Sequence, residues 1–66
     1  MTERAMLWRL AWAHGVQEER AGMAYCSSDT PNAMAAYLRG RLAYQSNPDR
    51  AWRCVGRIYV WLGLRP

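Results

Sequence analysis

Two short signals divide this chain into helical segments. Thr30-Pro31 and Asn47-Pro48 each place a capping side chain directly before a proline. The side-chain oxygen of Thr or Asn can accept a hydrogen bond from a free N–H group at the start of a helix. Proline suits the first helical position because its fixed φ matches the helix and it has no N–H to satisfy. We therefore expect new helices to begin at Pro31 and Pro48.

The segment before Thr30 has its own start signal and contains no proline. Thr2 can cap a helix, and Glu3 places an acid in the first turn. We expect this helix to reach about Ala24, with a polar break over residues 26–30. Its apolar residues cover more than the single stripe of a surface helix, which predicts packing against two elements, or against one element and a partner.

Two glycines interrupt this first expected helix. Glycine in a helix interior costs roughly 0.5–1 kcal/mol relative to alanine, so each one needs a packing or backbone reason. We expect a second helix backbone to approach closely at Gly15. Near Gly22 we expect the helix to fray.

The last segment fits two secondary structures. As a helix it separates an apolar face from a stripe of Arg50, Arg53 and Arg57, and Trp61 extends this stripe by one turn. As a strand, residues 55–62 are rich in β-branched and aromatic side chains. The start signal and the separation of charge favour the helix.

The whole chain, residues 1–66, is predicted to be one small all-α domain. It reads as a helical hairpin followed by a C-terminal Arg-bearing helix. A chain of this length buries only about 60% of the surface that its unfolded form exposes, so its stability is expected to be marginal. The sequence leaves open whether the chain forms a homodimer. The longest uncharged apolar run, residues 58–64, is far short of a bilayer span, so we expect no membrane insertion and a cytoplasmic location.

Arginine supplies all nine basic residues, and the net charge is +4. A guanidinium binds phosphate or carboxylate through two parallel hydrogen bonds, and it stacks on aromatic rings. Such a surface favours RNA, an acidic protein face or anionic lipid. Codon usage in a GC-rich genome is the alternative account of the same composition. The candidate nucleic-acid-binding or partner-binding residues are Arg39, Arg41, Arg50, Arg53, Arg57 and Trp61.

The run from Gly15 to Gly22 resembles the ribosome modulation factor family and its small phage and plasmid relatives. That family shows a G-x-Q-x-x-x-A-G run on its first helix, a loop with Cys and Pro, and an aromatic-Leu-x-Gly run on its second helix. The resemblance covers residues 14–43. The residues that match its scaffold are Gly15, Gln17, Ala21, Gly22, Tyr37, Leu38 and Gly40.

The chain also departs from the family pattern. Cys and Pro are adjacent in the family, whereas Cys26 and Pro31 are five positions apart here. Arg41 stands where the family has an aromatic residue. Residues from Pro48 onward lie outside the resemblance.

The resemblance implies a small non-enzymatic protein that docks on ribosomal RNA and helps to inactivate ribosomes. Clustered arginine side chains are compatible with this, since they bind the RNA backbone and stack on unpaired bases. The alternative is a phage- or mobile-element-encoded inhibitor, of the anti-CRISPR or anti-defence type, that blocks an acidic host protein complex. Exposed Trp and Arg side chains would suit that role equally.

The sequence predicts no active site, metal or cofactor. His14 and Glu18 are four residues apart and could hydrogen-bond, but no nucleophile stands at a recognisable spacing. We therefore interpret His14 as a satisfied histidine within the helix packing. Cys26 and Cys54 lack the paired spacing of a zinc site, so each is interpreted as a packed thiol. A single disulfide between the two remains possible from the sequence.

Overall fold

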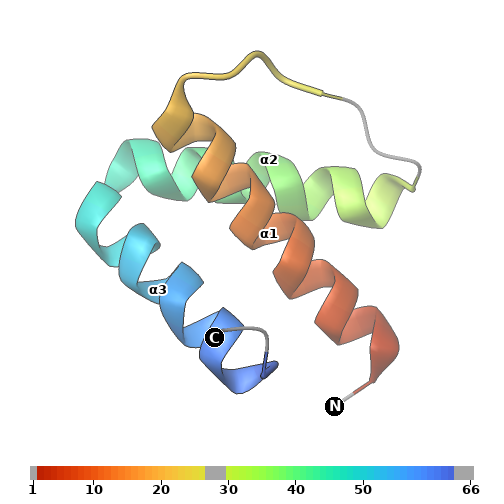
Figure 1. The fold of residues 1–66 in the computed structure, drawn as a ribbon. Helices are drawn as coiled ribbons and strands as arrows, with labels where there is room; N and C mark the ends of the chain where they lie inside the picture. Colours follow the sequence, from red (N-terminus) through yellow and green to blue (C-terminus); the bar gives the residue numbers. More distant parts are fainter. Residues whose placement is uncertain (1, 27–29, 64–66) are drawn as a thin grey trace.

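The computed structural model describes residues 2–26 and 30–63. Its helices are α1 (Glu3–Ala21), α2 (Pro31–Ser46) and α3 (Pro48–Trp61), and the described residues contain no strand. The all-α class and the small three-helix domain are therefore confirmed (Figure 1). Part of the expected polar break, residues 27–29, lies outside the described residues.

Each helix begins at a capping side chain, as predicted. Thr30 Oγ1 accepts a hydrogen bond from the N–H of Ala33 at 3.1 Å, and Asn47 Oδ1 accepts one from the N–H of Arg50 at 3.2 Å. Thr2 caps α1 in the same way. These bonds satisfy N–H groups that have no partner within the helix.

The ends of the helices correct one expectation and settle another. Helix α1 ends at Ala21 rather than near Ala24, because Gly22 takes the left-handed conformation with φ 70°. Glycine adopts this conformation without steric cost, which makes it a common helix stop. Helix α3 continues to Trp61, so residues 55–61 form a helix and not a strand.

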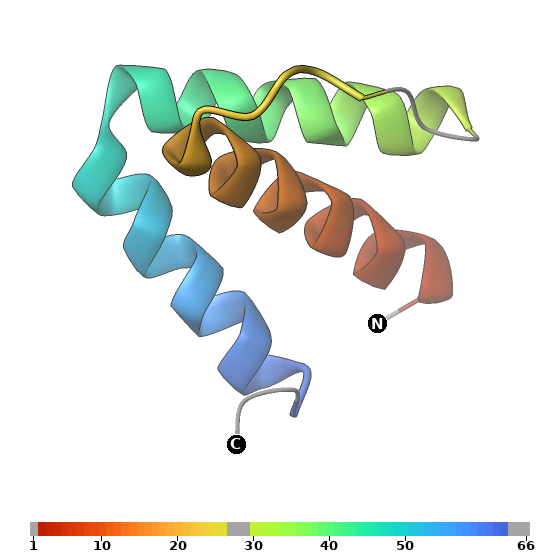
Figure 2. The ribbon, with the colours of Figure 1, turned by 45° about the horizontal axis from the view of Figure 1, so that its top comes forward.

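Helices α1 and α2 cross obliquely and run in the same general direction along the chain (Figures 1 and 2). In both views each helix runs from right to left. Because they do not run antiparallel, α1 and α2 do not form the helical hairpin that the sequence predicted. The connection must return from the end of α1 to the start of α2, and residues 22–26 begin that return. This return path carries a stretch of loop back past side chains of α1.

The two helix backbones touch where α1 and α2 cross. A Cβ atom at Gly15 would collide with the carbonyl oxygen of Tyr37 and lie 3.0 Å from its carbonyl carbon. A Cβ atom at Gly40 would collide with the carbonyl of Trp12 in the same way. The close approach predicted at Gly15 is confirmed, and Gly40 makes the reciprocal contact.

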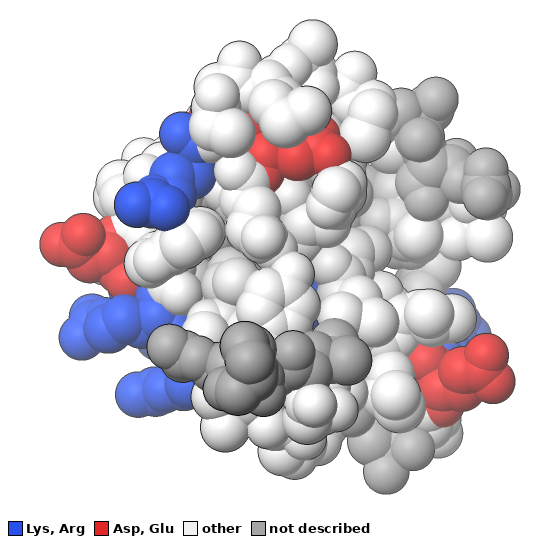
Figure 3. Space-filling model, viewed as in Figure 1, with Lys and Arg blue, Asp and Glu red and all other residues white. Residues whose placement is uncertain are grey.

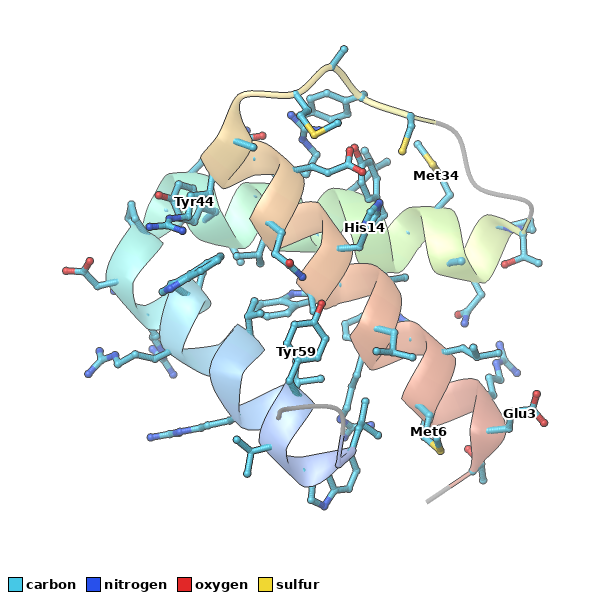
Figure 4. All side chains as sticks on the ribbon, in the orientation of Figure 1. Glu3, Met6, His14, Met34, Tyr44 and Tyr59 are labelled. Carbon is cyan, nitrogen blue, oxygen red and sulfur yellow. The ribbon has the colours of Figure 1, made fainter. Side chains whose placement is uncertain are left out.

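Helix α3 packs antiparallel to α1. Arg20, at the end of α1, stacks its guanidinium on Trp52 near the start of α3, with 4.0 Å between the guanidinium carbon and the ring centroid. Arg9, near the start of α1, stacks on Trp61 at the end of α3. Tyr59 projects from α3 toward α1 (Figure 4), where its hydroxyl accepts a hydrogen bond from Gln17. Helix α1 therefore packs against both other helices.

A small core lies between α1 and α3. Ala13 and Val16 from α1 are fully buried and pack with Ala51 and Val55 from α3, which are each 4% exposed. Larger, partly buried side chains from all three helices surround this cluster: Trp12, Ala43, Tyr44, Ile58 and Tyr59. Among the residues that the structure describes, no helix is both long and apolar enough to cross a membrane.

Candidate binding surface and buried polar cluster

One face of α3 carries three exposed arginines. Arg50, Arg53 and Arg57 are spaced by three and four residues, so they lie on the same side of the helix. We call these three residues the arginine face. Ala51 and Val55 point the other way, into the core. Figure 3 shows basic side chains gathered on the left of the molecule, where α3 lies, with an acidic side chain among them.

Two exposed tryptophans lie on α3, and Trp61 is the one that continues the arginine face. Trp61 is one turn beyond Arg57 and is 56% exposed, and the guanidinium carbon of Arg9 lies 5.2 Å from its ring centroid. Trp52 is also exposed and holds the stacked guanidinium of Arg20. Stacking of a cation on an indole is favourable even at an exposed site. Helix α3 therefore presents cationic and aromatic groups together.

Arg39 and Arg41 are not part of the arginine face. Arg39 is exposed, but it projects from α2. Arg41 is only 3% exposed, which corrects our expectation of a surface residue. Its position faces the crossing with α1, where Glu19 accepts a hydrogen bond from Nε at 2.8 Å. A guanidinium with its donors occupied inside the fold is not available to an external partner.

Arg41 belongs to a buried polar cluster, which we define as Glu18, Glu19, Tyr37 and Arg41. Nη1 of Arg41 donates to the hydroxyl of Tyr37 at 2.7 Å, and this hydroxyl donates to Oε1 of Glu18 at 2.6 Å. The guanidinium also donates to the carbonyl of Met23 in the returning loop. Because buried polar groups are costly unless they are paired, the cluster depends on all of its members.

The same contacts shift the pKa values of the cluster. The hydrogen bond from Tyr37 is the main cause that lowers the pKa of Glu18, and it outweighs the opposing effect of burial. Burial and the bond to Glu18 raise the pKa of Tyr37. Burial by itself would lower the pKa of Arg41, but its hydrogen bonds to Tyr37 and Glu19 raise it. At neutral pH the cluster therefore holds a charged guanidinium, an ionised Glu18 and a neutral tyrosine.

The other residues of the family motif lie within the helix packing or at its ends. Gln17 donates to the hydroxyl of Tyr59 and so links α1 to α3. Ala21 is the last residue of α1, and Gly22 is the left-handed residue that follows it. Leu38 is half-buried on α2. Gln17 thus faces another helix, whereas Ala21 and Gly22 are exposed.

A third group of side chains comes together where the loop returns past α1. Nε2 of His14 contacts Oε2 of Glu18, and Sγ of Cys26 lies 3.6 and 3.7 Å from the two oxygens of that carboxylate. The histidine side chain is 60% exposed, rather than enclosed in the helix packing as expected. Figure 4 shows it projecting from α1 on the side where Met34 of α2 lies.

The two cysteines differ in their surroundings. Cys26 is exposed and lies beside Glu18, so it is not the packed thiol that the sequence suggested. Cys54 is partly buried on α3. Both are free thiols, so the disulfide that the sequence left open is not formed.

Comparison with known proteins gives no relative for this chain: no family model, no curated protein and no solved structure matches it. The resemblance to the ribosome modulation factor family therefore stays a prediction that depends on the motif residues alone.

Proposed function

We propose that this protein binds RNA through the arginine face, and that ribosomal RNA is its partner. The observation that carries the proposal is the exposure of Arg50, Arg53 and Arg57 on one side of α3, while the opposite side of the same helix forms the core. The three side chains span about 10 Å along the helix axis, at 1.5 Å per residue. Cations at this density can contact successive phosphates of a strand.

The aromatic groups support RNA over a purely anionic partner. Unpaired RNA bases stack on aromatic rings and on guanidinium planes. Trp61 continues the arginine face and is more than half exposed, which leaves part of its indole available to a base. The ribosome modulation factor motif on α1 and α2 adds the reason to test ribosomal RNA first.

The binding test compares two single substitutions that remove the same charge. Arg57→Gln changes the arginine face, whereas Arg4→Gln changes an exposed arginine at the opposite end of the sequence, in the first turn of α1. Affinity for single-stranded ribosomal RNA is measured at several salt concentrations. We expect Arg57→Gln to lower the slope of log K against log salt by about 0.7, the contribution of one phosphate contact, and Arg4→Gln to leave it unchanged. Equal effects of the two substitutions, or binding that does not depend on salt, would contradict the proposal.

An inhibitor that docks on a protein complex is the second candidate. Exposed Val60 and Trp61 favour it, since an apolar side chain beside tryptophan and arginine is typical of the centre of a protein interface. A pull-down from nuclease-treated extract separates the two functions. Ribosomal components lost on nuclease treatment support RNA binding. A protein complex that survives nuclease, and is lost in the Arg53→Glu/Arg57→Glu variant, supports the inhibitor.

A further inference from the structure

We infer that His14, Glu18 and Cys26 form a binding site for a single zinc ion. The Nε2 atom, a carboxylate oxygen and Sγ lie within 4.8 Å of one another. Imidazole, carboxylate and thiolate are the three ligand types that zinc takes from proteins. The site lies apart from the arginine face and is independent of the proposed RNA binding.

The spacing of the donor atoms suits tetrahedral zinc. With Zn–S near 2.3 Å and Zn–N or Zn–O near 2.0 Å, neighbouring ligand atoms stand about 3.5 Å apart. Sγ of Cys26 is 3.6 and 3.7 Å from the carboxylate oxygens of Glu18, which already meets this requirement. His14 must move away from the carboxylate, and its exposed side chain has the freedom to do so.

The buried polar cluster supplies the support that a metal-binding carboxylate needs. Oε1 of Glu18 accepts the hydrogen bond from Tyr37, while Oε2 faces His14. One oxygen is thus held in place and the other points toward the donors from histidine and cysteine. Ligands fixed by such outer contacts bind metal more tightly than free side chains.

The charges of the site also balance when its neighbours are counted. The guanidinium of Arg41 lies 2.8 Å from Oε1 of Glu19 and 3.5 Å from Oε1 of Glu18. Zinc and this guanidinium carry three positive charges, and the thiolate of Cys26 and the two carboxylates carry three negative charges. Solvent can complete the tetrahedron, since His14 and Cys26 are exposed. Bound zinc would fasten the returning loop at Cys26 to α1.

The test uses Co²⁺ as a probe, because a cobalt–thiolate bond gives a charge-transfer absorption band. The 66-residue protein is treated with a chelator to remove bound metal and is titrated with Co²⁺, and then with Zn²⁺. We expect the band to saturate at one equivalent and to disappear as Zn²⁺ displaces Co²⁺. Cys26→Ser should abolish the band, and His14→Ala should weaken binding about tenfold or more while the band persists at high Co²⁺ concentration.

Cys54→Ser is the matched control, because it removes the other free thiol and should leave the titration unchanged. Circular dichroism of each metal-free variant shows whether it is folded. His14 and Cys26 are exposed, so we expect their variants to fold. The inference is overturned if the wild-type protein shows no thiolate band, or if Cys26→Ser and Cys54→Ser bind metal equally.

Discussion

The α1–α2 pair and α3 are held in the fold by different means. Where α1 and α2 cross, backbone lies against backbone at Gly15 and Gly40, and the buried polar cluster closes one side of the contact. Helix α3 packs through small side chains such as Ala51 and Val55, and turns its arginines outward. The difference shows that a chain this short can combine a tightly packed region, which tolerates few substitutions, with a surface on which substitutions cost the fold little.

Loss of Arg41 should have the largest effect. Arg41→Met removes the guanidinium and leaves Glu18, which is buried, and Glu19, which is partly buried, without the cation that they share. We expect the variant to lose cooperative unfolding or to melt far below the wild-type protein, as measured by circular dichroism. Arg39→Met, an exposed change on the same helix, is the control and should melt close to wild type. Similar melting of the two variants would mean that the polar cluster does not hold the pair together.

The second prediction concerns the crossing itself. Gly40→Ala should destabilise the fold by about 3 kcal/mol or more, because the new methyl group meets the backbone of Trp12 and the helices must separate. This loss would occur although alanine is intrinsically the better helix former.

Gly22→Ala serves as the comparison for Gly40→Ala. Nothing lies within 4 Å of a Cβ atom at Gly22, so only the strain of its positive φ should destabilise the fold, by about 1 kcal/mol. Urea unfolding measures both values. A smaller loss at Gly40 than at Gly22 would show that the helices can move apart easily.

The polar cluster should also give the protein a stability that falls at both ends of the pH range. The pKa of Glu18 is lowered from 4.5, so the stability that Glu18 contributes to the fold is present above pH 4.5 and is lost as the pH falls through the lowered pKa. The pKa of Tyr37 is raised from 10.0, so the stability that Tyr37 contributes is present below pH 10 and is lost as the pH rises through the raised pKa.

Tyr37→Phe tests this pH dependence, because it removes both the titrating hydroxyl and the hydrogen bond to Glu18. We expect the variant to be less stable at neutral pH, with a flatter profile at both ends. Tyr25→Phe keeps the ring beside Arg41 and should retain the wild-type profile. Melting temperatures between pH 3 and pH 11 provide the measurement. An unchanged profile in Tyr37→Phe would assign the pH dependence to other groups.

The arginine face should show the smallest effect on stability. Arg57→Gln removes one exposed charge and is expected to change the free energy of unfolding by less than about 0.5 kcal/mol. If it destabilises the fold as much as Gly22→Ala, then the outward face of α3 takes part in holding the helix, and the contrast between the two regions is weaker than the structure suggests.

The helices could be predicted from the sequence because their start signals are local. Thr30 and Asn47 each form a bond to a residue three positions ahead, so the pattern and the contact lie in the same short stretch. The position of Arg41 could not be predicted in this way, since its partner Glu19 is 22 positions earlier. The one available signal was the arginine standing in place of the family's aromatic residue after Gly40.

The group of His14, Glu18 and Cys26 shows the same limit. The first two are one helical turn apart, so their contact follows from the spacing. Cys26 joins them only because α1 and α2 run in the same direction and the loop has to come back. Sequence spacing argues against zinc here, whereas the path of the chain brings the three donors together.

The paired glycines also have a consequence for how this sequence can vary over time. When two side chains collide, a smaller neighbour can often restore the fit, so a harmful change at one site can be rescued at another. Gly15 and Gly40 each face a main-chain carbonyl, which no substitution can make smaller. No second substitution can therefore compensate for a larger residue at either position. In a library selected only for folding, we expect both positions to stay glycine, while the arginines of α3 are replaced by many other residues.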